Sequence, residues 1–437
     1  MVFWKEILRT PVVCSLVAVL LLTSCAPPPA KAGEFVRSDA ERVSLPDVSD
    51  VDLEKLVGGN NAFAYDLYQA WREQEGNLFY SPYSISVALA MTYAGARGET
   101  ETQMAETLHF LLSRDDLHPA LNALDQELDR RAAAAGSEED EAFRLSIANS
   151  IWGQAGYDFL PTFLDILAKN YGAGLRLTDF AKDPDKSRVI INDWISDQTE
   201  ARIEDLIPEG EITPLTRLVL ANAIYFKASW LHQFDESRTR DRAFYLLNGE
   251  QVSVPMMSLS EPPRLLYARG NGYQAVELPY VGNQVAMAII MPDAGEFEEF
   301  EAGLDAAQME EILAGMDYET LALRLPKFSF ESSFSMAKTL AAMGMPDAVS
   351  IADADFSGMD GTHDLYIQSV FHKAFVAVDE AGTEAAAATA VVMSLKGAMP
   401  SGIDLAIDHP FIFLIRDSVT GSVLFVGRVL NPVSANS

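Results

Sequence analysis

Cysteine is nearly absent from this chain of 437 residues. The two cysteines, Cys14 and Cys25, both lie near the N-terminus, so no thiol follows Cys25. A disulfide framework, a cysteine-based zinc site and a thiol nucleophile are therefore excluded from the remaining chain. The fold beyond Cys25 must depend on packing and noncovalent contacts.

Basic residues are scarce relative to acidic ones. The 32 lysines and arginines are outnumbered by 63 aspartates and glutamates, which gives a formal net charge of -31 and a pI near 4.4. Nucleic acids and anionic lipid surfaces both attract clustered basic residues, so this charge argues against a nucleic acid partner and against a charge-driven membrane contact. Hydrophobic residues make up 49% of the chain, which is typical of a globular protein with a sizeable core.

The chain also lacks the local motifs of common enzymes. It contains no Gly-x-Ser-x-Gly elbow, no His-Glu-x-x-His pair, no phosphate-binding loop and no Gly-rich dinucleotide turn after a strand. None of its six histidines lies at metal-ligand spacing from another. We therefore expect no catalytic residues, no metal and no cofactor, although a triad assembled in space would leave no local motif.

The first 25 residues have the pattern of an export signal. Lys5 and Arg9 precede a nearly continuous apolar run at 12–22, about 11 residues long and well short of the roughly 20 that a membrane-spanning helix needs. The sequence Leu-Thr-Ser-Cys at 22–25 resembles the bacterial lipobox, which implies cleavage before Cys25 and acylation of Cys25. An ordinary secretory signal with an incidental cysteine is the alternative.

This pattern predicts three segments. They are a lipoprotein signal peptide over residues 1–24, a lipidated Cys25 with a Pro- and Ala-rich tether over residues 25–50, and a single domain over residues 51–437. We expect an exported protein in the periplasmic or extracellular space that contacts the membrane only through the lipid at Cys25. Ala26, where an Asp often signals inner-membrane retention, favours the outer membrane or the cell surface.

Helical spacing of apolar residues is concentrated in the first half of the domain. It predicts helices over residues 61–75, 84–96 and 189–199. Runs rich in β-branched and aromatic residues, mostly in the second half, predict strands over residues 218–226, 275–278, 285–291, 321–325, 375–379, 411–416 and 423–429. This distribution is typical of an α+β domain and not of a regular strand–helix alternation.

The segment 383–396 contains neither glycine nor proline, which a true loop usually carries. It follows a predicted strand and a predicted break at Gly382. In an extended conformation one face would carry the small or β-branched residues Thr383, Ala385, Ala387, Thr389 and Val391, with Glu384 on the opposite face. Such a segment can slide into a β-sheet with its small side chains inward. An Ala-rich helix after a glycine break is the alternative.

Blocks of sequence along the domain resemble the serpin family of serine protease inhibitors. The segment 380–389 is similar to the hinge of inhibitory serpins. The other blocks, which follow the family's order, are 77–85, 220–230, 325–328, 355–358, 371–374, 408–413 and 424–432. The resemblance implies an α+β serpin fold: about nine helices around three β-sheets, with a large central sheet A and an exposed reactive-centre loop at about residues 380–404.

The resemblance also implies a mechanism and a partner. In an inhibitory serpin the exposed loop is offered to the protease as a substrate. The protease that cleaves the loop becomes acylated, and it moves with the loop as the loop inserts into the central sheet. Counting the family's distance from Glu380 places the scissile bond between Lys396 and Gly397, which implies a trypsin-like serine protease as partner. Met393 and Leu395 are competing positions that would imply elastase- or chymotrypsin-like targets. The implied hinge residues are Glu380, Gly382, Thr383, Glu384, Ala385, Ala386, Ala387, Ala388 and Thr389.

Two further groups match family positions around the central sheet. The polar shutter residues beneath the sheet are Ser81, Ser84, Asn222 and His372. Trp230 and Lys327 match the breach, where the loop first inserts, and an ion pair between Lys327 and Glu380 is implied. We expect a monomer. A non-inhibitory serpin with a carrier or chaperone role, a surface hydrolase and a structural surface lipoprotein remain alternatives.

Overall fold

The computed structural model describes residues 34–135, 143–383 and 402–433. In these ranges the α-helices are α1 (Asp50–Trp71), α2 (Pro82–Tyr93), α3 (Gly98–Thr107), α4 (Arg114–Ala135), α5 (Pro161–Tyr171), α6 (Pro184–Gln198), α7 (Phe297–Ala302), α8 (Ala306–Ala314), α9 (Ala337–Met343) and α10 (Ser357–Asp360). None of the helices in the described ranges is long and apolar enough to cross a bilayer.

Two short 3-10 helices lie at Glu236–Arg238 and Asp347–Val349, and the described ranges contain seventeen strands. They are β1 (Phe35–Val36), β2 (Leu78–Tyr80), β3 (Phe143–Gln154), β4 (Leu175–Thr178), β5 (Leu218–Ser229), β6 (Arg240–Tyr245), β7 (Gln251–Ser258), β8 (Arg264–Gly270), β9 (Tyr273–Pro279), β10 (Val285–Pro292), β11 (Asp317–Pro326), β12 (Phe328–Ser335), β13 (Ile367–Val378), β14 (Gly382–Thr383), β15 (Ile403–Ala406), β16 (Phe411–Asp417) and β17 (Val423–Val429).

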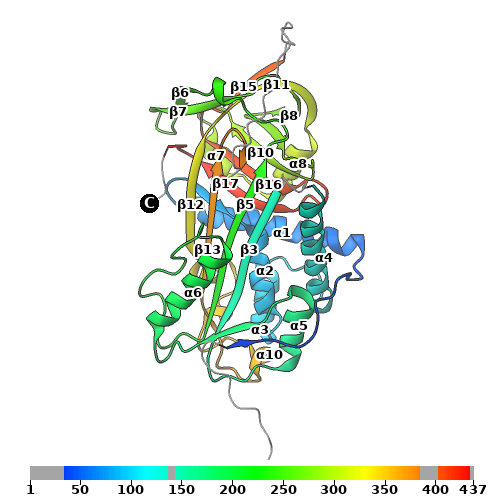
Figure 1. The fold of residues 1–437 in the computed structure, drawn as a ribbon, viewed down its shortest axis with the longest axis vertical. Coiled ribbons are helices and arrows are strands. Elements are labelled where there is room, and N and C mark those ends of the chain that lie inside the picture. The colour runs from blue at the N-terminus through cyan, green and yellow to red at the C-terminus, as the bar shows by residue number, and fades with distance from the viewer. Residues whose placement is uncertain (1–33, 136–142, 384–401, 434–437) are drawn as a thin grey trace, which may run out of the picture.

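A seven-stranded central sheet runs along the length of the molecule. Its strand order is β1-β4-β3-β5-β14-β13-β12, and Figure 1 shows β12, β13, β5 and β3 side by side, with α6 over their lower part. β5 is antiparallel to β3 on one side. On the other side β5 is parallel to β13, with Leu218 opposite Ile367 and Tyr225 opposite Phe375. The two middle strands therefore pair directly over most of their length.

Two further sheets share the strand β11. The first half of β11 pairs with β8, which belongs to the sheet β2-β17-β16-β10-β9-β8. The second half of β11 pairs with β7, which pairs with β6, and β15 adds in parallel. The predicted α+β class with a large central sheet is confirmed; the other two sheets are joined through β11 into a single ten-stranded one, and the described ranges contain ten α-helices instead of about nine.

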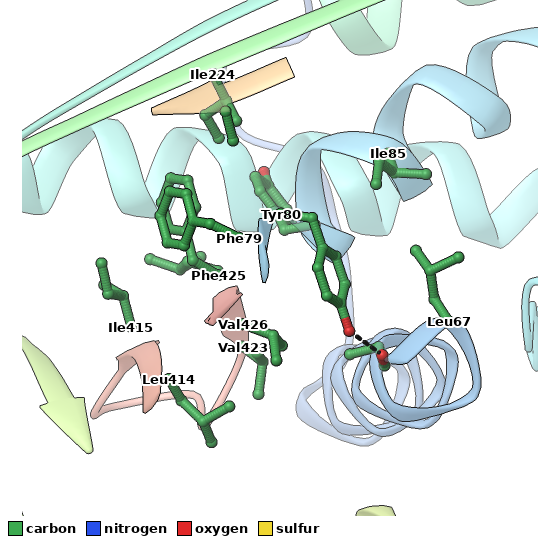
Figure 2. Close-up of a cluster of buried hydrophobic side chains, with 14 of the residues drawn as sticks. Leu67, Phe79, Tyr80, Ile85, Ile224, Leu414, Ile415, Val423, Phe425 and Val426 are labelled. Atoms are coloured by element: carbon green, nitrogen blue, oxygen red, sulfur yellow. Dashed lines mark hydrogen bonds between the residues drawn. The ribbon is translucent and has the colours of Figure 1, made fainter. Parts of the chain in front are cut away.

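The main hydrophobic core joins α1 and α2 to the sheet that contains β17. Figure 2 shows Phe79 of β2 stacked on Phe425 of β17, with ring centroids 5.0 Å apart. The buried phenol of Tyr80 donates its hydrogen to the carbonyl oxygen of Ala64 in α1 at 2.7 Å, so this polar group keeps a partner inside the core. These two contacts attach α1 to β2 and β2 to β17.

The predicted helix at 61–75 is α1, which begins earlier, at Asp50. Its N-cap is Ser49, whose side chain accepts from the amide of Asp52. The sequence pattern missed residues 50–60 because two glycines and two asparagines interrupt it at 58–61, and these residue types form helices poorly. Tertiary contacts compensate: Asn60 Nδ2 donates to the carbonyl oxygen of Val423 at 3.3 Å.

The segment before α1 lies against the domain. β1 adds to the edge of the central sheet, where Phe35 lies opposite Arg176 of β4. Arg42 forms an ion pair with Asp125 at 2.6 Å, and the amide of Val43 donates to the carbonyl oxygen of Lys169 at 2.9 Å. Of the tether predicted over residues 25–50, residues 34–49 are therefore part of the folded domain.

Candidate inhibitory site in the central sheet

After β13 the chain turns back and starts a new strand inside the central sheet. β14 is antiparallel to both neighbours, because Thr383 lies opposite Ala228 of β5 and opposite Val378 of β13. The turn is closed by Asp379, whose Oδ1 accepts from the amides of Ala381 and Gly382 at 2.9 and 3.1 Å. β14 thus separates the tops of β5 and β13, which pair directly lower down.

Gly382 is part of this short strand and not the point where β13 breaks. The break spans residues 379–381, which form the turn, so the predicted break at Gly382 is wrong in position. A Cβ at Gly382 would lie 1.9 Å from the carbonyl oxygen of Ala228. Glycine is required there because the two backbones approach too closely for any side chain.

Thr383 points inward, as its place on the small-residue face predicts. It is only 1% exposed, and its Oγ1 lies 2.7 Å from the hydroxyl of Tyr280. Tyr280 in turn stacks on Trp230 with ring centroids 4.6 Å apart. Three sets of predicted residues lie outside the described ranges: the hinge residues Glu384, Ala385, Ala386, Ala387, Ala388 and Thr389, the bond between Lys396 and Gly397, and the competing positions Met393 and Leu395.

The predicted ion pair at the top of the sheet is present. Lys327 Nζ lies 2.6 Å from Glu380 Oε2, and Thr239 Oγ1 donates to Glu380 Oε1 at 2.7 Å. Burial alone would raise the pKa of the Glu380 carboxyl, but the hydrogen bonds from Lys327 and Thr239 outweigh it and lower that pKa below its usual value. Trp230 Nε1 donates to the carbonyl oxygen of Asp379 at 2.9 Å. Both predicted breach residues therefore hold the turn that precedes β14.

The bounds of the exposed loop are narrower than the predicted 380–404. At the start, Glu380 is 7% exposed and Gly382 and Thr383 are buried. At the end, Ile403 already belongs to β15, where it lies opposite Leu321 of β11. Packing against neighbouring strands thus removes residues from both ends of the predicted loop.

The four predicted shutter residues meet beneath the middle of the sheet. The backbone amide of Ser81 donates to His372 Nε2 at 3.2 Å, and His372 Nδ1 bonds to Asn222 Oδ1. Asn222 Nδ2 donates to Ser84 Oγ at 2.6 Å. His372 and Asn222 are register partners on β13 and β5, so this network bridges the two strands that would separate to admit a new one. All four residues are buried, and each has a hydrogen-bond partner.

Burial keeps His372 neutral. The ring lies within the core, and this desolvation lowers its pKa from 6.5 to about 3. Since the backbone amide of Ser81 donates to Nε2, the proton of the neutral ring belongs on Nδ1, from where it is donated to Asn222. Protonation of Nε2 would remove the acceptor for Ser81 and place a charge between β5 and β13.

The stability of the native state should therefore decrease on mild acidification. An unfolded chain takes up a proton on His372 below its ordinary pKa of 6.5, but the folded chain does so only near 3, so stability falls as pH drops through this window. His118, whose pKa burial lowers to about 4, adds to the effect. Each contributes about 1.4 kcal/mol per pH unit well inside its window. Thermal unfolding of the wild type and of His372→Gln between pH 7 and 5 measures this, and an equal pH dependence in both would contradict it.

Several residues of the site are not found by the sequence patterns. Asn149 of β3 joins the shutter, because its Nδ2 donates to the carbonyl oxygen of Ser84 at 3.2 Å and Asn222 lies opposite in register. Its strand alternates apolar and polar residues at 143–147, which was a usable signal for the strand but not for Asn149 itself. Thr239 and Tyr280 come from outside the central sheet, and no local pattern marks them.

The comparison with known families identifies the family to which this chain and its site belong. The sequence model described as serpin (serine protease inhibitor) matches residues 58–432. The chain belongs to the serpin family. It is 36% identical over 391 residues to the human leukocyte elastase inhibitor, which covers 87% of this chain and 100% of that protein. It is also 40% identical over 379 residues to a serpin-like protein of Thermococcus kodakarensis, with 86% of each chain covered.

Solved serpin structures have the same fold. The native state of the thermophilic serpin tengpin superposes with a TM-score of 0.79 at 28% identity and covers 91% of this chain and 100% of that one. Uncleaved ovalbumin superposes with a TM-score of 0.76 at 26% identity, covering 86% and 100% of the two chains. The serpin fold is confirmed, and these relatives support a protease inhibitor and not a catalytic enzyme.

Proposed function

We propose that this serpin inhibits a trypsin-like serine protease by covalent trapping, with Lys396–Gly397 as the cleaved bond. One observation carries the proposal: the first two residues after the turn, Gly382 and Thr383, already form a strand between β5 and β13. A fixed helix after a glycine break would not begin this way. The small side chains that follow in the sequence suit continued insertion.

Continued insertion would separate β5 from β13. Each further loop residue moves one position back along β5, so Met393 would reach Leu218 at the far end of that strand. The new strand would replace the direct pairing between β5 and β13 and would hydrogen-bond on both sides. Alanines and threonines on the inward face can pass the closing sheet, whereas long or charged side chains cannot.

The covalent step would follow the ordinary chemistry of serine proteases. The serine oxygen of the protease attacks the carbonyl carbon of Lys396, an ester to that carbonyl forms, and the amide bond to Gly397 breaks. The leaving amine of Gly397 takes up a proton, and the chain from Gly397 onward separates from the loop. Insertion to Met393 would then carry the ester, three residues farther on, to the opposite end of the sheet before water can hydrolyse it.

The target preference can be tested at Lys396. A lysine before the bond suits a specificity pocket that contains a carboxylate, so Lys396→Leu should lower the rate of trypsin inhibition roughly 100-fold or more and create inhibition of chymotrypsin. The control is Lys338→Leu on the exposed side of α9. Mass spectrometry of the peptide released from the wild type should show Gly397 at its N-terminus. A different N-terminal residue in the released peptide would show that the cleaved bond lies elsewhere. Unchanged trypsin inhibition in Lys396→Leu would contradict the assignment of Lys396 as the residue before that bond.

The N-terminal sequence supports a proposal about location. We propose that the chain is exported, acylated at Cys25 and held as a monomer at the outer membrane or cell surface. The lipobox-like residues 22–25 and the apolar run before them support this. Labelling with a radioactive or alkyne-tagged fatty acid tests it, since Cys25→Ser should abolish incorporation.

A further inference from the structure

The first strand of the described chain lies at one end of the central sheet. Phe35 of β1 lies opposite Arg176 of β4, which lies opposite Trp152 of β3. Trp152 in turn lies opposite Val219, the second residue of β5. β1 is therefore level with the start of β5, and the end of β5 lies about ten residues, or roughly 33 Å, away.

The strand directions show from which side the chain joins the domain. β5 runs from Leu218 to Ser229, toward the end of the sheet that contains β14. β3 is antiparallel to β5, β4 is parallel to β3, and β1 is antiparallel to β4. β1 therefore runs in the same direction as β5, so the chain before Glu34 joins the domain at the end away from β14. Figure 1 shows β1 as a dark blue strand at the end near α10.

The reactive loop is attached at the other end of the sheet. Thr383, the last described residue before the loop, lies opposite Ala228 near the end of β5. Ile403 begins β15, and Figure 1 shows β15 at that same end. This end is the loop pole, and the end at Glu34 and Leu218 is the tether pole. The two attachment points thus lie at opposite poles of the molecule.

Two contacts fix the start of β1 to its neighbour β4. The amide of Leu177 donates to the carbonyl oxygen of Glu34 at 2.9 Å. The guanidinium carbon of Arg176 lies 4.9 Å from the centroid of the Phe35 ring, in a cation–π contact. The chain is therefore part of the domain from Glu34 onward. The segment 25–33 before it has nine residues and spans at most about 30 Å when fully extended.

We propose that the acylated protein stands on the membrane by its tether pole and presents the reactive loop to soluble proteases of the surrounding space. This inference rests on the acylation proposed for Cys25. The short tether keeps the tether pole within about 30 Å of the bilayer surface, whereas the loop pole lies farther out. The net charge of -31 opposes a flat position of the domain on anionic lipids. A protease held in the same membrane with its active site close to the bilayer would not reach the loop.

Loop insertion would then move the protease to the other side of the inhibitor. Continued insertion brings Met393 level with Leu218, because each loop residue moves one position back along β5. Leu218 lies at the tether pole, so the ester at Lys396 would pass beyond that pole. A protease captured from solution would end between the domain and the membrane.

Energy transfer to labelled lipids tests the orientation. Leu247 in the β6–β7 connection at the loop pole and Leu215 just before β5 at the tether pole are exposed, at 46% and 64%. A donor dye is attached to Leu247→Cys or Leu215→Cys in the mature acylated protein, where the lipid occupies the thiol of Cys25. Each protein is added to preformed phosphatidylcholine vesicles that contain a small fraction of acceptor-labelled lipid. Thermal unfolding shows whether each labelled variant is folded.

The label at the tether pole should lie closer to the membrane. Transfer from Leu215→Cys should be at least about threefold more efficient than transfer from Leu247→Cys, because the length of β5 alone separates the poles by roughly 36 Å. Equal transfer from both positions, or more transfer from Leu247→Cys, would overturn the proposal.

A longer tether is the matched control. A flexible insertion of about 40 glycine and serine residues after Lys31 would let the domain turn freely, so most of the difference between the two labels should disappear. If the difference stays unchanged, the surface of the domain sets its orientation, and the proposed role of the tether is wrong.

Failure of the acylation proposal is recognised separately, because a protein without a lipid would not bind the vesicles. The two labels are then compared on chain 26–437, which lacks both cysteines and keeps all described residues. An N-terminal hexahistidine tag binds this chain to a nickel-chelating lipid. The same difference is expected, because this tether joins the same pole, and equal transfer from both labels would overturn the orientation.

Dye-labelled trypsin tests where the trapped protease lies. Trypsin whose catalytic serine is replaced by alanine can bind the loop but cannot form the ester, so it should show little transfer to the acceptor lipid. Active trypsin should show several-fold more transfer once it is covalently trapped. If trapped trypsin shows no more transfer than the inactive form, the proposal is wrong. If no covalent complex forms, the inhibitory function fails, and the comparison of the two labels still decides the orientation.

Discussion

Thr383→Arg is expected to abolish stable complex formation with a trypsin-like protease while leaving cleavage of the loop intact. Thr383 is almost fully buried, and its hydroxyl lies against that of Tyr280. An arginine there would have to bury a charge without a carboxylate partner, which is far more costly than burying threonine. That cost would keep β14 out of the sheet before cleavage, so the cut loop would have to bury the arginine as it inserts. Each 1.4 kcal/mol added to this barrier slows insertion about tenfold, and hydrolysis of the ester would then precede insertion.

The stoichiometry of inhibition measures this change. It should rise from about one inhibitor per protease to more than about ten, because most molecules would be cleaved as substrate. Thr102→Arg on the exposed side of α3 is the control for an added arginine and should behave as the wild type. If Thr383→Arg still inhibits at a ratio near one, Thr383 is not part of the hinge that inserts into the sheet.

Cleavage of the loop is expected to raise the unfolding temperature of the wild type by roughly 10 °C or more. In the uncleaved chain the described part of β14 is Gly382–Thr383, and β5 and β13 pair directly below it. A cut would free the loop to continue β14 down the sheet, which adds a central strand with hydrogen bonds on both sides and releases stored free energy. Calorimetry before and after limited cleavage of the loop by a protease that the protein does not inhibit measures the difference.

The hinge variant provides the matched comparison. Cleaved Thr383→Arg should gain little or no thermal stability, because its loop cannot follow β14 into the sheet. A wild-type protein with the same unfolding temperature before and after cleavage would contradict loop insertion and would favour a non-inhibitory serpin with a carrier or chaperone role.

The sequence predicts the parts of the site that depend on residue order. The blocks around Ser81, Asn222 and His372 mark the shutter residues through the family resemblance, and the structure joins them in one network. The pair between Lys327 and Glu380 is likewise found where the resemblance places it. The α+β class follows from the distribution of helical and strand patterns along the chain.

Other features depend on contacts between distant segments that no local pattern shows. Residues 34–49 look like a polar tether, but β1 can pair with β4 because the edge of the central sheet offers unpaired backbone groups. The chain leaves β13 at the turn that Asp379 closes. Gly382 is needed for a different reason, because its backbone lies too close to Ala228 for a side chain to fit. The start of α1 depends on contacts to β17 that outweigh poor helix formers.

A denaturing gel of the purified protein mixed with trypsin tests the central claim most directly. Covalent trapping predicts a band at the summed mass of protease and cleaved inhibitor that survives heating in detergent, forms within minutes and is absent with Thr383→Arg. Complete conversion of the wild type to cleaved fragments, with trypsin fully active and no such band, would contradict the inhibitory mechanism.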